Sequence, residues 1–179
     1  MIITNMAKHF CLINRHRWEV FKLSIRLGIP IRGFLHDLSK FSWTEFVESA
    51  KYYDGGRSPI TLCKKEKGYS EAWLHHKGRN KHHVEYWVDE KAPNPTPMIP
   101  YKYLREMVCD QVAAGMVYQG KKWVKEYQLS YWNKNKDKFR ANEKIKTFLT
   151  EVYEQLAKEG LDKTITKKNI REIYEKTCM

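Results

Sequence analysis

The sequence predicts an all-α protein. Apolar residues recur at helical spacing through most of the chain, strand signals are almost absent, and no internal repeat is found. The first predicted helix covers residues 10–27, where Gly28 and Pro30 stop it. At 179 residues, of which 42% are hydrophobic, the chain is the size of one compact domain, or of one domain with a helical appendage, and can bury a core.

Further helices are expected before residue 70. Residues 31–37 restart an apolar face, and Ser42 then begins S-W-T-E, a capping box that predicts a helix as far as Tyr53. Asp54-Gly55-Gly56 ends that helix. Residues 55–70 carry Gly, Pro and the lysine cluster KKEKG, which indicates a mobile surface loop.

The middle of the chain alternates short helices with breaks. Residues 71–77 are predicted to be helical, Gly78-Arg79-Asn80 interrupts, and residues 82–88 resume the helix. The run APNPTPMIP, residues 92–100, contains four prolines and must be extended. It leads into a long helix that starts near Tyr101.

The C-terminal part becomes rich in lysine after Gly120. One amphipathic helix there is marked by the i, i+3, i+4, i+7 pattern of Ile145, Phe148, Leu149, Val152, Tyr153 and Leu156. Gly160 ends it, and residues 165–174 suggest another helix. We therefore expect a site-bearing domain over residues 1–120 and basic helices over residues 121–179 that pack on the same core.

Composition favours anionic partners. The net charge is +12 and the isoelectric point is near 9.5, which suits nucleotides, nucleic acid or phosphorylated metabolites, although much of the lysine excess can equally be a solvated helix surface. The four cysteines lie far apart with no C-x-x-C pair, so free thiols in a reducing cytoplasm are the simplest interpretation. The sequence shows no signal-peptide core and no apolar stretch long enough to span a membrane, so we expect a cytoplasmic protein without a membrane partner.

Histidines and carboxylates form the chemistry-bearing pattern. His36 and Asp37 are adjacent at the start of a helical segment, and neighbours on a helix diverge by about 100°, so they can share a metal only near the edge of a face. His16 lies upstream, and Asp110 falls within an apolar helical stretch where a carboxylate requires a partner such as a cation. Four of the seven histidines lie within nine positions: His75, His76, His82 and His83.

A straight helix could not bring this last cluster to one ion. Positions seven apart, such as His76 and His83, would lie about 10 Å apart along the axis, too far to share a metal. The break at Gly78-Arg79-Asn80 removes that obstacle. The cluster is therefore compatible with a metal site, and its alternative interpretation is a pH-sensitive surface patch.

The order of these motifs resembles the HD-domain metallohydrolase superfamily, in which H, HD, optional further histidines and D follow one another. More narrowly, HDLSKF (residues 36–41), H-x-x-x-N-x-H-H (residues 76–83) and E-M-x-x-D (residues 106–110) look like a family described only as a domain of unknown function. The resemblance spans roughly residues 10–118 and implies an HD-domain-like helical bundle with additional C-terminal helices.

The resemblance also implies a ligand set. It places one metal ion among His16, His36, Asp37 and Asp110. The extra histidines suggest a second ion that Asp37 would bridge. Its expected ligands are His76 and one of His82 and His83, while the other would contact substrate or support a ligand. His75 is expected to face solvent. Iron, manganese, zinc, nickel and cobalt all accept such ligands, whereas dense imidazole argues against magnesium alone.

Several nearby residues are candidates for catalysis or substrate binding. Lys40 follows Asp37 by three positions, so one helical turn would bring its ammonium close enough to neutralise a phosphate, although it could also be a solvated lysine. Glu106 could orient a ligand histidine, act as a base, or be an ordinary surface carboxylate. The remaining candidates for holding a phosphate ester are Lys77, Arg79 and Asn80.

The expected function is a metal-dependent phosphohydrolase that acts on a nucleotide or another small phosphorylated metabolite. No P-loop, G-x-G-x-x-G or Ser or Cys nucleophile signature competes with it. One alternative is an HD-type di-iron oxygenase, which bound iron and an oxygen-dependent colour change would favour. The other is a basic nucleic-acid or protein-binding module with a structural metal site, whose nucleic-acid binding would depend on salt and survive chelation.

Overall fold

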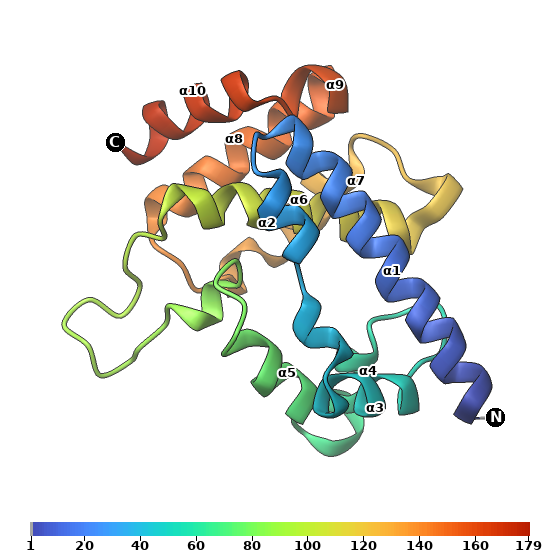
Figure 1. Ribbon diagram of the computed structural model, residues 1–179. Helices are drawn as coiled ribbons and strands as arrows, with labels where there is room; N and C mark the ends of the chain where they lie inside the picture. Colours follow the sequence, from blue (N-terminus) through green and yellow to red (C-terminus); the bar gives the residue numbers. More distant parts are fainter. Residues whose placement is uncertain (1) are drawn as a thin grey trace.

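Helices are the regular secondary structure that residues 2–179 form in the computed structural model, which confirms the predicted all-α class. Figure 1 shows α3, α4 and α5 at one end of the molecule, α8, α9 and α10 at the other, and α6 between them. The helices are α1 (Ile2–Arg26), α2 (Pro30–Leu35), α3 (Trp43–Lys51), α4 (Pro59–Lys67), α5 (Glu71–Lys77), α6 (Tyr101–Gln119), α7 (Tyr127–Asn135), α8 (Glu143–Glu159), α9 (Leu161–Thr164) and α10 (Lys167–Cys178).

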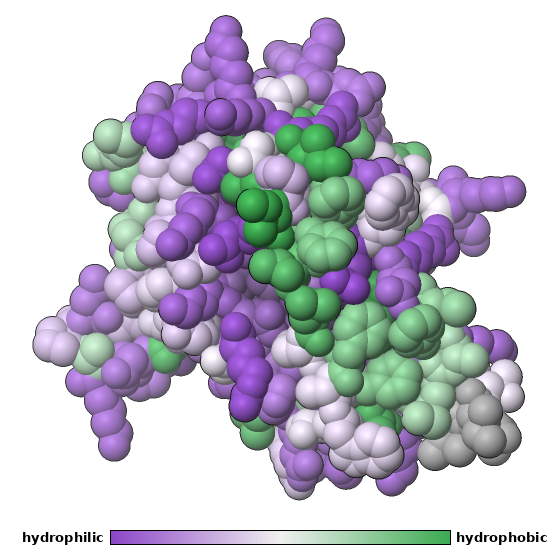
Figure 2. Space-filling model, viewed as in Figure 1, coloured by the Kyte–Doolittle hydropathy of each residue, from purple (hydrophilic) through white to green (hydrophobic). Residues whose placement is uncertain are grey.

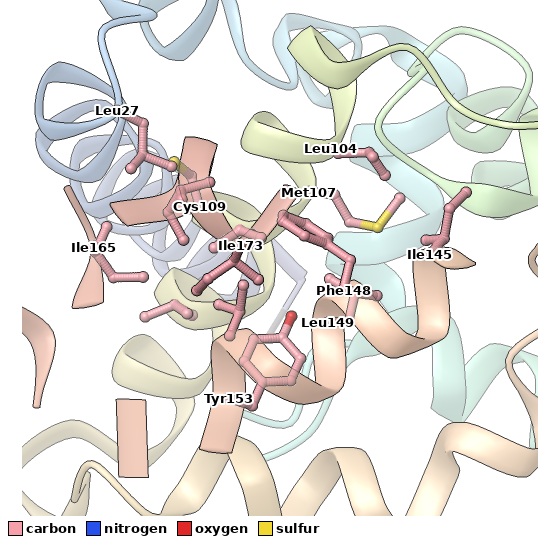
Figure 3. Close-up of a cluster of buried hydrophobic side chains, with 14 of the residues drawn as sticks. Leu27, Leu104, Met107, Cys109, Ile145, Phe148, Leu149, Tyr153, Ile165 and Ile173 are labelled. Carbon is pink, nitrogen blue, oxygen red and sulfur yellow. The ribbon is translucent and has the colours of Figure 1, made fainter. Parts of the chain in front are cut away.

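The core surrounds α6, which is buried along most of its length. Met107 of α6 packs in one cluster with Phe148 and Leu149 of α8 (Figure 3), and Val108 and Val112 of α6 belong to the same cluster. Burying a side chain of this size contributes about 1.5–3 kcal/mol. Because α8 packs in this cluster and α1 contacts α6 as well, Glu106 of α6 is buried and Asp110 is half-buried.

α1 contributes a stripe that mixes apolar and imidazole side chains. Its buried positions recur at alternating intervals of four and three residues, which is the spacing of one helix face. They are His9, Ile13, His16, Val20 and Leu23, continued by Leu27 just past the helix end, with the buried Ser24 beside Leu23. The stripe faces α6, α2 and α3, so both histidines are carried into the interior by ordinary helix packing.

α2 lies close against α1 because Gly33 has no side chain. A Cβ atom at this position would lie 2.3 Å from the Cβ and Oγ atoms of Ser24 on α1, which is a steric clash. Arg17 of α1 then donates to two carbonyls at the end of α2, from Nη2 to Phe34 at 2.7 Å and from Nε to His36 at 2.9 Å. These contacts fix the backbone that leads into the His36-Asp37 doublet.

The prediction of a mobile loop over residues 55–70 was wrong, since Pro59–Lys67 form helix α4. Pro59 occupies the first helical turn, and Gly68 ends the helix with a left-handed φ of 84°. Proline inside the start and glycine just past the end are helix boundary signals. Glycine, proline and lysine content favours a loop here, whereas the positions of Pro59 and Gly68 indicate a helix between them.

Other segments differ from expectation in smaller ways. Residues 82–88 form only a short 3-10 turn, Val84–Tyr86, in place of a resumed helix. Residues 92–96 bend, so the proline-rich run is extended only at its end. Helix α7 was not predicted at all. The helices predicted over residues 71–77, from Tyr101 and around residues 145–156 are confirmed by α5, α6 and α8.

The C-terminal helices share their core with the rest of the chain. One cluster of buried side chains includes residues of α1, α6, α8 and α10. Polar contacts add to it: Tyr153 donates to Gln111 Oε1 at 2.6 Å, and Arg26 pairs with Asp162. The division of the chain at residue 120 stays a prediction. The shared packing allows it to be tested by truncating the chain there.

An apolar band lies on the face that α1 and α2 present in Figure 2. These helices and the turn that follows them carry exposed large apolar side chains, namely Phe10, Trp18, Ile25, Ile31, Phe34, Leu35 and Leu38.

Within residues 2–179, none of the helices combines the length and the apolar character that a membrane span needs.

His9 is a buried histidine at the junction of α1 and α3. It is 6% exposed and packs against the rings of Phe46 at 5.5 Å and Tyr53 at 5.8 Å between centroids. Burial, helped by the charge of Lys40, lowers the pKa of His9 to about 4. His9 therefore stays neutral in the folded protein at neutral pH.

We predict that a chain ending at Gly120 loses its cooperative thermal transition. Truncation exposes the α6 side chains that pack on α8, and it removes six fully buried residues of α8, each worth about 1.5–3 kcal/mol. Circular dichroism melts of the truncated and full-length chains provide the measurement. A truncated chain that is soluble, melts cooperatively and binds metal would show that residues 121–179 form an independent module.

A second prediction concerns the pH dependence of stability. The folded pKa of His9, about 4, lies below its ordinary value of 6.5, so the unfolded chain takes up the proton first and stability falls as the pH drops from about 6.5 to 4. In His9→Gln, the loss of unfolding free energy between pH 7 and pH 5 should be smaller by about 2 kcal/mol. Urea titrations at both pH values measure this, and Lys8→Gln, at an exposed neighbour, should keep the wild-type dependence.

Candidate metal centre

His36 and Asp37 lie in the link between α2 and a 3-10 turn, η1 (Leu38–Phe41). His36 has extended backbone angles, whereas Asp37 has φ 54° and ψ 28°, in the left-handed region. Asp37 is the only non-glycine residue among residues 2–179 with a positive φ. Such strain is concentrated at functional sites. Because neither residue is helical, their side chains do not diverge as neighbours on a helix do. His36 Nε2 lies 3.2 Å from Asp37 Oδ2.

A first group of possible metal ligands draws on three elements. α1 supplies His16, the link supplies His36 and Asp37, and α6 supplies Asp110; one ligand atom from each lies within 4.8 Å of the others. Asp110 Oδ1 is 3.0 Å from His16 Nε2 and 3.4 Å from His36 Nε2. Asp110 therefore faces His36, and these are the four residues that the HD resemblance places around one ion.

A second group shares Asp37 with the first. It consists of Asp37, His76, His82 and His83, again with ligand atoms within 4.8 Å of one another. His76 Nε2 lies 2.9 Å from His83 Nε2, and Asp37 Oδ1 lies 3.4 Å from His76 Nε2 and 3.5 Å from His82 Nε2. The turn after α5 allows this approach, as the sequence predicted. Both His82 and His83 are within reach, where only one was expected to be a ligand.

Glu106 contacts two of these histidines from behind. Its Oε1 atom lies 3.2 Å from His36 Nδ1 and 3.4 Å from His82 Nδ1, while Oε2 accepts from Arg32 at 2.9 Å. A carboxylate on Nδ1 fixes the tautomer and leaves Nε2 free to bind a metal. Glu106 also forms a third possible ligand group with His36 and His82, but its contacts with Nδ1 atoms indicate an orienting role.

Glu45 has the same arrangement around the second group, although its place in the S-W-T-E pattern indicated only a capping role. Its two oxygens lie 2.8 Å from His76 Nδ1 and 2.6 Å from His75 Nδ1. His75, expected to face solvent, is half-buried against this carboxylate. Only the serine half of the capping box is present: Ser42 Oγ accepts from the Glu45 amide at 3.4 Å, while the Ser42 N–H donates to the Ser39 carbonyl. No spacing rule indicated that Glu45 would be 3% exposed.

The residues predicted to hold substrate after α5 have other contacts. Asn80 Nδ2 donates to Ser39 Oγ and to the His76 carbonyl, both at 2.8 Å, so it supports the turn that carries the histidines. Arg79 is exposed and lies 3.4 Å from the His75 carbonyl, and Lys77 is half-buried. None of these three lines the cavities described below. The turn is used to place ligands, which leaves its side chains outside the opening.

Charges in the centre perturb one another strongly. Burial alone would raise the pKa of Asp37, but His36 and Lys40 hold it well below its usual range; Lys40 Nζ lies 2.6 Å from Asp37 Oδ2. Burial would likewise raise the pKa of Asp110, and hydrogen bonding from His16 and His36 holds it well below.

The imidazoles respond in opposite directions. Burial would lower the pKa of His36, but the carboxylates of Asp37, Asp110 and Glu106 raise it well above its ordinary value. For His83, burial and the neighbouring His82 lower the pKa well below its ordinary value, so that His83 is neutral. A neutral imidazole is the form that binds a metal.

The buried polar atoms fit a metal ion. Five of them have no hydrogen-bond partner of good geometry and belong to the two groups: His16 Nε2, His36 Nε2, Asp37 Oδ1, Asp37 Oδ2 and His82 Nε2. Buried polar atoms without partners are costly and rare in folded proteins. Asp110 and Glu45 also contact only histidines among the charged side chains that the structure describes. A cation bound by these N and O atoms would give the unpaired atoms a partner and would balance the charge of the carboxylates.

Two adjoining cavities open beside the centre. The one we call the metal-side cavity, of about 390 Å³, is lined by His16, His76, His83, Asp110 and Lys40, and also by His9. The one we call the tyrosine cavity, of about 400 Å³, is lined by Tyr118, Tyr127, Tyr131, Gln111 and Gln128. Both volumes are typical of small-molecule sites.

Helix α4 forms a wall of these cavities, where the sequence predicts a mobile loop over residues 55–70. Ser58 and Thr61 line both cavities, and Lys64 lines the metal-side cavity with its ammonium 4.5 Å from the centre of the Trp73 ring. Lys64 and the predicted Lys40 therefore line the cavity beside the histidine cluster, whereas Lys77 and Arg79 line neither cavity.

No curated protein and no solved structure matches the chain. A family model does match it, over residues 5–155, and this span contains every residue of the two ligand groups and of the cavity walls. The chain belongs to the family described as "Family of unknown function (DUF5662)".

Proposed function

We propose that the protein is an HD-type, metal-dependent phosphohydrolase that acts on a nucleotide or another small phosphorylated metabolite. The observation that carries the proposal is the set of buried N and O atoms around Asp37 that lack hydrogen-bond partners of good geometry, beside a cavity lined by His16, Asp110 and Lys40. The order of the motifs, which resembles the HD superfamily, supports the same conclusion.

The two ligand groups define where metal would be held. His16, His36, Asp37 and Asp110 would hold one ion, and Asp37 with His76, His82 and His83 would hold a second. Divalent iron, manganese, zinc, nickel and cobalt suit this mixture of imidazole and carboxylate. When bound, such ions act as Lewis acids towards phosphoryl oxygens and lower the pKa of water.

The protein's own side chains bind and orient. Lys40 is paired with Asp37 at the edge of the metal-side cavity, where its ammonium would neutralise a phosphate oxygen and stabilise charge that develops on it. Glu106 and Glu45 would hold the ligand histidines in the tautomer that presents Nε2. We assign Glu106 this positioning role in place of general-base catalysis, because His36, His82 and Arg32 already occupy its two oxygens.

The cations favour phosphate-ester hydrolysis over oxygen activation. Lys40 and Lys64 both line the metal-side cavity, and ammonium groups beside a metal site attract anionic substrates. A cavity of about 390 Å³ also suits a small molecule better than a nucleic-acid strand lying on the surface.

The first test separates the roles of Asp37 and Lys40. Asn tolerates the left-handed backbone of position 37, so Asp37→Asn should keep the fold but lose bound metal, because the carboxylate common to both groups is gone. Lys40→Met should keep the metal. Metal content is measured by mass spectrometry after loading each variant with iron, manganese, zinc, nickel or cobalt, with circular dichroism as the folding control. Equal metal loss in the two variants contradicts these roles.

The second test is the activity itself. Metal-loaded protein should release phosphate from members of a panel of nucleoside phosphates and sugar phosphates, and a chelator should abolish the release. Lys40→Met should lower kcat by about 10²-fold, the typical effect of removing one charge-stabilising donor. Lys22→Met, on a side chain of α1 that pairs with Glu19, serves as the matched control. Phosphate release that is absent with every metal, or oxygen consumption by the iron-loaded protein in its place, would overturn the proposal.

A further inference from the structure

The tyrosine cavity is not needed to hold metal, yet it has the features of a binding site. The rings of Tyr127 and Tyr131 on α7 are stacked, with centroids 6.2 Å apart and an angle of 23° between the ring planes. Tyr131 is 54% exposed and lines both cavities. An aromatic ring at such an opening offers a face on which a planar ligand can stack.

Two amide side chains lie in the same cavity. Gln128 is 2% exposed, and its Oε1 atom has no hydrogen-bond partner among the described residues. Gln111, which directly follows Asp110, uses Oε1 to accept the Tyr153 hydroxyl at 2.6 Å. That bond fixes the Gln111 amide and leaves its Nε2 group available as a donor. The cavity therefore combines an unused acceptor on Gln128 with a donor on Gln111.

The close packing of α7 on α6 builds this arrangement. A Cβ atom at Gly115 of α6 would lie 3.1 Å from Gln128 Oε1 and 3.1 Å from ring carbons of Tyr127. The absence of a side chain at this one position lets both residues approach α6 closely. The amide and the aromatic rings are therefore held by a helix contact and not by a loop.

The two cavities are continuous at their shared lining. Asp110, Ser58 and Tyr131 line both of them. A ligand that placed an anionic group beside Lys40 and the metal ligands would extend along α6 from Asp110 towards Gln111. Its other end would then meet the tyrosine rings and the two amides.

We propose that the tyrosine cavity binds a nucleobase: a planar heteroaromatic ring that stacks on Tyr131 and presents hydrogen-bond donors and acceptors to Gln128 and Gln111. The position assigned to the ligand's phosphate rests on the proposed function, whereas the position assigned to its base does not. Among small phosphorylated metabolites, this subsite selects nucleotides over sugar phosphates, because a sugar ring has no π face for stacking.

The experiment uses nucleosides, which carry the base but no phosphate, and metal-free protein. Adenosine, guanosine, cytidine and uridine are titrated calorimetrically into the full chain, with ribose as the probe that lacks a base. At least one nucleoside should bind, and ribose should not. Tyr131→Ala should weaken that binding roughly 5- to 100-fold, the range for loss of one base–aromatic stack. Tyr69→Ala, at a tyrosine that is 50% exposed and lines neither cavity, should leave it unchanged.

A second variant tests the amide. Gln128→Met keeps the volume but removes the acceptor, and it should also weaken nucleoside binding while the circular dichroism melt stays cooperative; if this variant does not fold, Tyr131→Ala decides alone. Failure of all four nucleosides to bind, or wild-type binding by Tyr131→Ala, overturns the subsite. Nucleoside binding that depends on Tyr131 supports it even where no phosphatase activity is found. Equal phosphatase activity on nucleotides and sugar phosphates, together with no nucleoside binding, would retain the proposed function and refute the subsite.

Discussion

Asp37 is fully enclosed and still carries a negative charge, so its surroundings have to supply compensating positive charge and donors. Its neighbours do so from several elements: His36 beside it in the link, Lys40 on the following turn, and His76 and His82 after α5. The left-handed backbone at position 37 turns the carboxylate towards all of them. Leaving such a charge without partners costs several kcal/mol, so the fold around the centre depends on these contacts.

The scaffold that holds these neighbours is ordinary helix packing used for two purposes. One face of α6 completes the apolar core against α8, and on the same helix Glu106 and Asp110 are four residues apart, hence on one face towards the histidines. α1 behaves in the same way, since His16 belongs to a buried stripe whose other members are apolar apart from His9 and Ser24. Ligands set on rigid helices within a core are held more firmly than ligands on loops.

How far the sequence could predict this centre depended on the kind of signal each residue carries. Asp110 was identifiable because a carboxylate in an apolar helical stretch needs a partner, and the His36-Asp37 doublet because it stands in a recognisable order with His16. Glu45 carried no such signal: it belongs to a capping box, and only the packing of α3 against α5 shows that it faces two histidines. Helix α4 was missed for a different reason, since its lysines and flanking glycines resemble a loop by composition, and its contribution to the cavity wall depends on tertiary contacts.

The charge distribution separates a buried layer suited to cations from an outer layer suited to anions. The inner layer, formed by Asp37, Asp110 and the imidazoles, is buried and rich in acceptors, which favours metal. The outer layer begins with Lys40 and Lys64 at the cavity and continues into a chain with net charge +12, which favours anions. Lys40 belongs to both layers, because its ammonium contacts Asp37 while its side chain is 26% exposed. Lys40 therefore presents the same ammonium to the buried carboxylate and to the cavity, so an anion in that cavity would compete with Asp37 for it.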